Sequence, residues 1–340
     1  MPAYWKITDR AIVNGTPTGD RGPLQYFVSD NGYDGGQDPL ANLKQWQSVS
    51  ANDFKTLLAA AADQFPALEP GDNEKQSHVT FLIHGYNNGW DDAARLYQKV
   101  CDQLYQGPGS LGICISFDWP SLGSVLDYLP VRNHAQECAG DLVVVFGLLY
   151  DWLLAKQQAA ANNPANACKA KISVIAHSMG NYLVQKAMAG AWTRNNQPLL
   201  VSLINQLVMV AADVDNDLFD ANSSDASDGN ALANLTYRIT ALYSGRDAVL
   251  GASAGLKHFG TRRLGRSGLA TRPPVGKDNI WDVDCSTFFP DSLTGFQIHS
   301  AYFDTAAVMK LIGDLLRGLD RSVLDSLGET KGNAWPPSVD

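Results

Sequence analysis

One serine in this chain has the local sequence of a catalytic nucleophile. Ser178 follows an apolar, largely β-branched run and precedes a helical pattern. Its neighbours, Ala176-His-Ser-Met-Gly180, match G-x-S-x-G with alanine in place of the first glycine. A strand–turn–helix of this kind holds a serine hydroxyl exposed in a sharp turn, where small neighbours are required because backbone segments approach closely. The sequence therefore predicts that Ser178 is the nucleophile of an acyl-transfer reaction.

A second serine matches the same consensus more literally. Gly251-Ala-Ser253-Ala-Gly255 has both glycines, but Ser244-Gly-Arg-Asp247 interrupts the preceding strand a few residues earlier. Because the motif is identified by its strand–turn–helix context, we favour Ser178 over Ser253. The alternative for Ser178 is a tight turn between strand and helix that happens to contain a serine.

A serine hydroxyl is a poor nucleophile at neutral pH and needs a histidine to take its proton. When the nucleophile lies in such a turn, the order along the chain is serine, acid, histidine, which leaves His258 and His299. We favour His299, because it follows the last predicted strand and is expected to open the last helix, whereas His258 has no strand end beside it. His134 and His177 are expected to be packing or surface residues.

An aspartate is expected to orient the imidazole and to stabilise its protonated form. Asp247 follows the predicted strand 235–243 and a Ser-Gly-Arg turn, which suits this role. Asp213 and Asp215 follow the preceding strand and are the alternatives. The sequence favours Asp247 and leaves this pair open.

Two backbone amides are expected to bind the negatively charged oxygen of the tetrahedral intermediate. One is the amide after the nucleophile, at Met179, and the other should come from the loop after an earlier strand. The run 79–84 is such a strand, and it leads into His84-Gly-Tyr86. Glycine lets the backbone approach a ligand, so the Tyr86 amide is the expected second donor.

No metal or cofactor is predicted. Asp213-Val-Asp215-Asn-Asp217 resembles the opening of a calcium loop, but Leu218 stands where glycine is needed and Ser224 where the bidentate glutamate belongs. The cysteines show no metal-like spacing and are expected to be mostly buried free thiols: Cys101, Cys114, Cys138, Cys168 and Cys285.

The composition is that of a globular enzyme without a nucleic-acid partner. The chain has 340 residues, 45% of them apolar and 18% charged, and its net charge of −9 disfavours binding to phosphates. The longest apolar run, 142–154, is shorter than the roughly 20 residues that span a bilayer, so it predicts a buried helix and no transmembrane segment. No secretory leader is visible, which predicts a cytoplasmic protein, or a periplasmic or secreted one if a leader has been removed.

Strand and helix patterns alternate along most of the chain. Strands are expected at 24–28, 79–84, 111–117, 171–177, 203–210, 235–243 and 280–284, and helices at 51–64, 91–104, 133–156, 179–192 and 299–319. This alternation predicts an α/β fold with a mostly parallel, doubly wound sheet and helices on both faces. Ligands of such sheets bind beyond the carboxyl ends of the strands, which is where the candidate residues lie.

Three segments are expected along the chain. Residues 1–75 are predicted to be an extension packed on the core, residues 76–320 the main domain and residues 321–340 a tail. Two long loops, 215–230 and 248–278, are expected within the domain. The basic stretch 257–277 is expected to be a solvated face, with attraction of an anionic acyl group as the alternative. Its basic residues are Lys257, His258, Arg262, Arg263, Arg266, Arg272 and Lys277.

These residues together resemble the α/β-hydrolase superfamily, and more narrowly a bacterial family of α/β hydrolases of unknown function. The resemblance covers residues 78–318 and rests on His84-Gly-Tyr-Asn-Asn88, Phe117-Asp-Trp-Pro-Ser121, Ala176-His-Ser-Met-Gly-Asn181, Ala211-Ala-Asp-Val-Asp215, Tyr243-Ser-Gly-Arg-Asp-Ala-Val-Leu250, Arg263-Leu-Gly265 and His299-Ser-Ala-Tyr302. It implies an α/β-hydrolase fold and supports Ser178, Asp247 and His299 as the triad. It also implies that Arg263-Leu-Gly265 belongs to the family framework.

The expected activity is that of a serine hydrolase which cleaves carboxylic esters, with a small-molecule or lipid ester as substrate. Lipase, thioesterase, amidase and acyltransferase activities on the same triad are the nearer alternatives. A non-catalytic binding protein that has kept the fold is the more distant alternative.

Overall fold

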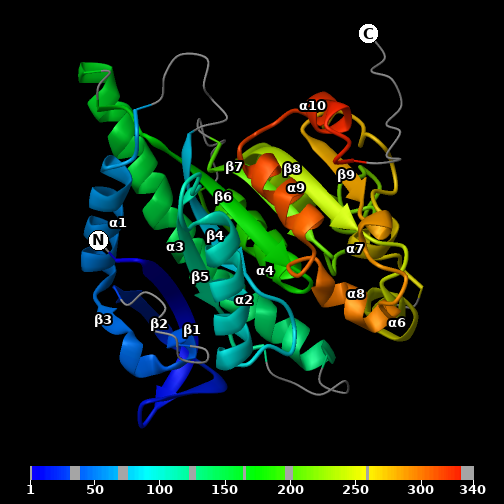
Figure 1. Ribbon diagram of the computed structural model, residues 1–340, viewed down its shortest axis with the longest axis horizontal. Coiled ribbons are helices and arrows are strands. Elements are labelled where there is room, and N and C mark those ends of the chain that lie inside the picture. The colour runs from blue at the N-terminus through cyan, green and yellow to red at the C-terminus, as the bar shows by residue number, and fades with distance from the viewer. Residues whose placement is uncertain are drawn as a thin grey trace.

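One sheet organises the molecule. The computed structural model describes residues 2–30, 39–67, 76–121, 128–163, 166–195, 202–257 and 260–330. Within them the strand order is β3-β2-β1-β5-β4-β6-β7-β8-β9 (Figure 1). The strands are β1 (Tyr4–Val13), β2 (Thr16–Ser29), β3 (Gln47–Val49), β4 (Ser77–Ile83), β5 (Gly112–Asp118), β6 (Ala170–His177), β7 (Ile204–Val210), β8 (Thr236–Tyr243) and β9 (Ile280–Asp284). Strand β2 is antiparallel to both neighbours and all other pairings are parallel, which confirms the predicted mostly parallel sheet.

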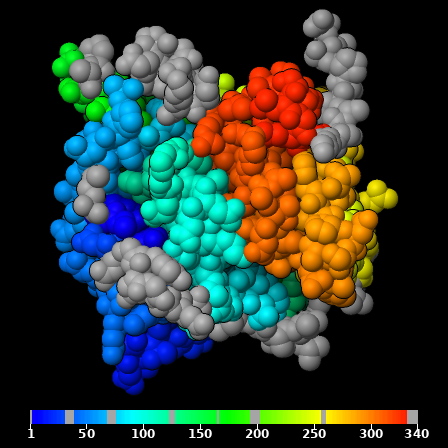
Figure 2. Space-filling view, viewed as in Figure 1, coloured from blue at the N-terminus to red at the C-terminus, as the bar shows by residue number. Residues whose placement is uncertain are grey.

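Helices cover both faces of the sheet, and each face has its own apolar core. One face carries α1 (Ala51–Asp63), α3 (Tyr128–Asn162), α4 (Gly180–Asn195) and α5 (Ala226–Leu235); the other carries α2 (Trp90–Leu104), α8 (Gly295–Ala301), α9 (Ala306–Leu316) and α10 (Arg321–Ser326). Figure 1 shows α2 and α9 in front of the sheet, and they lie side by side on that surface (Figure 2). Along β6, Ile172 and Val174 lie in the first core and Ile175 in the second, as alternation along a strand requires.

The N-terminal segment contributes strands to the central sheet. Strand β1 pairs in parallel with β5, and β2 and β3 continue the sheet beyond it. The sequence predicted only 24–28 as a strand in this segment. It missed β1 because that strand buries Lys6, Asp9 and Arg10, so its inward positions do not form an apolar pattern.

Two predictions about the C-terminal half are wrong in detail. The predicted helix 299–319 is two helices, because the chain turns at 302–305 and the Thr305 hydroxyl donates to the Ala301 carbonyl. His299 therefore lies in the last turn of α8 and does not open a helix. The predicted loops contain the start of α5 and three short elements: α6 (Ala248–Ala252), a π-helical turn (Ser253–Lys257) and α7 (Leu264–Ser267). Elements this short show too little periodicity to be recognised.

The predicted helix 133–156 is confirmed within the longer α3. It begins at Tyr128, and Pro130 is tolerated because it lies in the first turn, where amides lack helical partners. In the described part of the chain, α3 is the one helix long and apolar enough to cross a membrane by length and composition. Leu142 and Phe146 pack in the core of the protein, and 39% of the apolar window of this helix is buried.

The strand order reverses at β4 and β6, which are neighbours at the centre of the sheet. From β4 the chain moves to β5 on one side, and from β6 it continues through β7 to β9 on the other. Ligands of parallel sheets bind at such a switch point, beyond the carboxyl ends of the strands. His84 follows β4 and Ser178 follows β6, so both candidate segments lie at this position.

Candidate active site

Ser178 lies in a strained turn between β6 and α4. Its φ is 52°, in the left-handed region that non-glycine residues rarely adopt, and its amide donates to the Val210 carbonyl at 3.0 Å. A Cβ on Gly180 would stand 2.5 Å from the His84 carbonyl oxygen, and a Cβ on Gly85 would stand 2.8 Å from the Ser178 Cβ. The small residues are therefore needed because the ends of β4 and β6 are in direct contact.

The structure brings Ser178, His299 and Asp247 together. His299 Nε2 lies 2.9 Å from Ser178 Oγ, and His299 Nδ1 lies 2.7 Å from Asp247 Oδ2. The Asp247 side chain is fully buried, and its other oxygen accepts from the Leu250 amide, which caps α6. Because a carboxylate can only accept, Nδ1 carries the imidazole proton and Nε2 faces the serine hydroxyl.

His177 supports this arrangement from behind. Its Nε2 lies 2.9 Å from the backbone oxygen of His299, and its ring centroid lies 5.0 Å from that of His299. Burial, and then the neighbouring His299, lower the pKa of His177 to about 3, so the ring is neutral. The sequence suggested a packing or surface role for His177. Its position directly before the candidate nucleophile was the signal that could have indicated this contact.

The two predicted oxyanion donors belong to segments that meet at Ser178, the candidate nucleophile. Met179 follows Ser178 directly, and Tyr86 belongs to the segment 84–88, which we call the oxyanion loop. The approach of Gly85 to Ser178 brings this loop to the elbow. The Tyr86 ring packs edge-on against Tyr128 at the start of α3.

The alternative acids, Asp213 and Asp215, contact other side chains. Asp213 accepts from Arg263 Nε at 2.8 Å, from the Tyr128 hydroxyl at 2.5 Å and from the Ser253 hydroxyl at 3.0 Å. Asp215 forms an ion pair with Arg263. Ser253, the serine of the more literal consensus motif, therefore hydrogen-bonds a carboxylate, and its segment forms a π-helical turn where a nucleophile elbow would need a strand–turn–helix.

The basic stretch 257–277 was expected to be exposed to solvent. This prediction is wrong for Arg263, because its side chain is fully buried. Next to it, a Cβ on Gly265 would stand 2.1 Å from the Ala211 carbonyl carbon, and the Gly265 amide donates to Ala212. This segment therefore packs backbone to backbone against residues 211–212, which follow β7. His258 lies outside the described residues.

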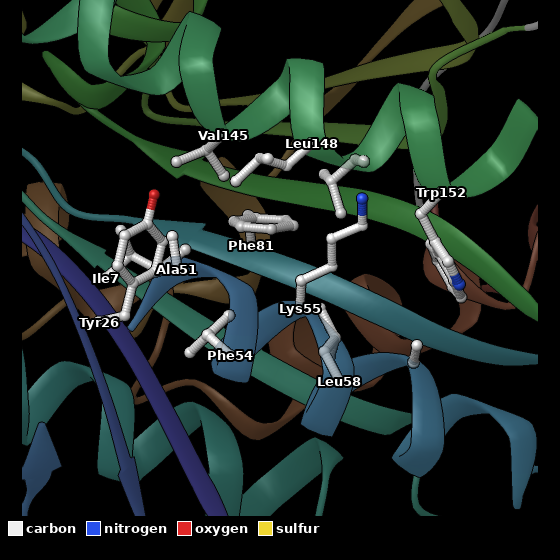
Figure 3. Close-up of a pocket in the computed structure, with 12 residues that line it drawn as sticks. Ile7, Tyr26, Ala51, Phe54, Lys55, Leu58, Phe81, Val145, Leu148 and Trp152 are labelled. Atoms are coloured by element: carbon white, nitrogen blue, oxygen red, sulfur yellow. The ribbon is translucent and has the colours of Figure 1, made fainter. Parts of the chain in front are cut away.

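No metal centre is visible in the described ranges, where no group of three or more His, Cys, Asp or Glu side chains is arranged to hold an ion. A cavity lies away from the triad, between α1, α3 and strands β1, β2 and β4 (Figure 3). Its lining is mostly apolar and includes Ile7, Tyr26, Phe54, Leu58, Val145 and Trp152. None of the triad residues lines it, so it is not the acyl pocket of the candidate site.

The sheet, the elbow and the hydrogen-bonded line of three side chains define an α/β hydrolase. A family model described as an α/β hydrolase of unknown function (DUF900) matches residues 68–314, and the chain belongs to this family. A comparison with curated proteins returned no match.

Three solved structures of hydrolases are distantly similar. An esterase from Pyrobaculum calidifontis is 12% identical over 82% of this chain and 92% of its own, with a TM-score of 0.32. The phospholipase PlaB from Legionella pneumophila is 12% identical over 76% of this chain and 64% of its own, with a TM-score of 0.35. An acylaminoacyl peptidase from Pyrococcus horikoshii is 11% identical over 90% of this chain and 46% of its own, with a TM-score of 0.29.

Proposed function

We propose that this protein is a serine hydrolase that cleaves carboxylic esters through an acyl-enzyme. The observation that carries the proposal is the continuous line from the Ser178 hydroxyl through His299 to the buried carboxylate of Asp247. The strained turn at Ser178 and its place at the switch point of the sheet support the same reading.

The geometry suits two successive acyl transfers. Ser178 Oγ attacks the ester carbonyl carbon while His299 Nε2 takes its proton, and Asp247 stabilises the imidazolium. The Met179 and Tyr86 amides bind the oxyanion of the tetrahedral intermediate. Collapse of the intermediate breaks the bond to the alcohol oxygen, which takes the proton back from Nε2. Water then repeats the sequence on the acyl-enzyme and releases the acid.

Hydrolysis of p-nitrophenyl esters tests the proposal. We expect Ser178→Ala to abolish hydrolysis apart from a small residual rate, whereas Ser253→Ala, at the other consensus serine, should keep most of it. Full activity in Ser178→Ala would reject the assignment. Loss of activity in Ser253→Ala with a folded protein and an active Ser178→Ala would move the nucleophile to Ser253.

Other acyl transfers on the same triad are the nearer alternatives. A chain-length series of nitrophenyl esters, together with matched thioesters and amides, separates esterase, lipase, thioesterase and amidase activities. Transfer to an added alcohol in place of water would identify an acyltransferase. A protein that fails to react with a fluorophosphonate would support the non-catalytic alternative.

A further inference from the structure

Strand β1 carries two buried cations toward the active-site end of the sheet. Lys6 and Arg10 are completely buried, four residues apart on one face of the strand, while Trp5 and Ile7 face the core beneath α1. Lys6 Nζ lies 3.4 Å from the centre of the Trp90 ring, at the start of α2. These positive side chains therefore lie inside the protein, where charge needs a partner.

Their partner is Asp118, at the end of β5. Arg10 Nε donates to Asp118 Oδ1 at 2.7 Å, Lys6 Nζ lies 3.6 Å from Oδ2, and His84 Nε2 lies 3.0 Å from Oδ1. Burial by itself would raise the pKa of Asp118, but Arg10, Lys6 and His84 hold it well below its ordinary value, so the carboxylate is ionised. A buried charge cluster of this kind is stable only while each member keeps its partners.

The same cluster holds the oxyanion loop. Arg10 Nη2 donates to the Asn88 carbonyl at 2.8 Å, and Asn88 Nδ2 donates to the carbonyls of Gly85 and Tyr86 at 3.0 Å each. His84 Nδ1 lies 3.0 Å from the same Gly85 oxygen. The Gly85 oxygen therefore accepts from Asn88 and lies within hydrogen-bonding distance of His84, and these two residues are in contact with Arg10 and Asp118.

Fixing the Gly85 carbonyl also fixes the direction of the Tyr86 amide. The two groups belong to one planar trans peptide, so the N–H points opposite to the C=O. Gly85 lies against Ser178, since a Cβ there would stand 2.8 Å from the serine Cβ. The peptide whose orientation the cluster sets is therefore the one beside the candidate nucleophile.

We propose that Arg10 and Asp118 are positioning residues of the active site, which orient the Tyr86 amide through Asn88 and His84. Strand β1 precedes the residues 68–314 that the family model matches, so this segment is part of the catalytic apparatus although the family match does not include it. The inference rests on the proposed function, because it requires that the Tyr86 amide binds an oxyanion.

The test compares Arg10→Gln and Asn88→Ala with Arg21→Gln as a matched control. Arg21 is also an arginine of the N-terminal hairpin with an aspartate partner, but that partner is Asp141 on α3. Each protein is assayed with p-nitrophenyl butyrate for kcat and KM. A trifluoromethyl ketone, which binds a serine as an anionic hemiketal, is then used as an inhibitor.

Removing one oxyanion donor costs about 10²–10³ in kcat. Misalignment of the donor should cause part of this loss in kcat. We therefore expect Arg10→Gln and Asn88→Ala to lower kcat about tenfold or more with little change in KM, and to raise the inhibition constant of the ketone by a similar factor. Arg21→Gln should match the wild type in all three constants.

Two outcomes would overturn the inference while leaving the proposed function intact. One is a folded Asn88→Ala with wild-type kcat and wild-type affinity for the ketone, whether or not Arg10→Gln folds. The other is a fall in kcat without any change in affinity for the ketone. A wild-type protein that neither hydrolyses the ester nor reacts with a fluorophosphonate would overturn the proposed function itself, and this inference with it.

Discussion

His177 Nε2 lies 2.9 Å from the backbone oxygen of His299, so the residue before the candidate nucleophile is bonded to the helix that carries the candidate base. Because a carbonyl oxygen only accepts, Nε2 of the neutral His177 ring carries the proton. The elbow and α8 are therefore joined by this hydrogen bond, by the one between Ser178 and His299, and by the contact between the rings of His177 and His299. The position of the base depends on all three.

Replacement of His177 tests this link. His177→Leu removes a hydrogen bond whose net value is about 1 kcal/mol, so we expect kcat to fall about fivefold for a p-nitrophenyl ester. His177→Gln keeps a side-chain donor and should recover part of the loss. Equal rates for the leucine and glutamine variants would contradict a positioning role for the hydrogen bond.

The two candidate acids should behave in opposite ways. Asp247→Asn leaves His299 with the wrong tautomer, so we expect kcat to fall by about 10⁴ with little loss of stability. Asp213→Asn leaves the buried Arg263 with a weaker set of partners, so we expect a loss of on the order of 3 kcal/mol in the free energy of unfolding. Urea unfolding and ester hydrolysis measure both effects. A stable but inactive Asp213→Asn beside an active Asp247→Asn would transfer the role of acid to Asp213.

Because the ends of β4 and β6 are in contact, substitution by alanine should have opposite effects on stability at Gly180 and at Gly140. Gly180→Ala would put a methyl group 2.5 Å from the His84 carbonyl, whereas nothing lies within 4 Å of the corresponding position at Gly140, on the exposed side of α3. We expect Gly180→Ala to lower stability by about 1–3 kcal/mol and to reduce activity. Gly140→Ala should raise stability by about 0.5–1 kcal/mol. Thermal unfolding of the two variants checks both values, and equal melting temperatures would contradict the close approach.

Buried histidines should make the protein less stable in acid. Burial is the main cause that lowers the pKa of His78 and of His177 from 6.5 to about 3. As the pH falls from 6.5 toward 3, the unfolded chain binds two protons that the folded chain does not. Stability should therefore fall by about 1.4 kcal/mol per pH unit for each histidine. Urea unfolding across this range measures the slope, and His78→Gln should reduce it; an unchanged slope would contradict the burial of a neutral ring.

Asp9 should have the opposite effect on the pH dependence of stability. Burial raises its pKa from 3.8 to about 7, so its contribution to stability is fully present below pH 3.8 and is lost as the pH rises to 7. We expect Asp9→Asn to raise the free energy of unfolding by more at about pH 8 than at about pH 4.5. A gain that is the same at both pH values would show that the carboxyl group titrates normally.

The central part of the fold could be predicted because its residues follow local rules. The apolar run before Ser178, the glycine at 180 and the helix after it specify the elbow by sterics alone. The order of serine, acid and histidine then led to Asp247 and His299, which the structure brings within hydrogen-bonding distance of one another. Ser178 and Asp247 follow the carboxyl ends of β6 and β8, and α8 brings His299 to the same edge of the sheet.

Other features depend on partners that lie far away in the sequence. The strand that holds Lys6 and Arg10 has polar inward positions, and they are stabilised by Asp118, more than a hundred residues later in the chain. The role of Asp213 could not be predicted either, because its partner Arg263 lies in a segment that looked like an exposed loop. Local patterns identify apolar burial, whereas the burial of paired charges is decided by tertiary contacts.

The most direct test of Ser178 as the nucleophile is reaction with a fluorophosphonate, followed by mapping of the modified residue. The wild-type protein is treated with the reagent, digested and analysed by mass spectrometry, beside Ser178→Ala and Ser253→Ala. We predict one covalent adduct on the wild-type peptide that contains Ser178, the same adduct in Ser253→Ala, and none in Ser178→Ala. An adduct on Ser253, or a wild-type protein that does not react, would contradict this assignment.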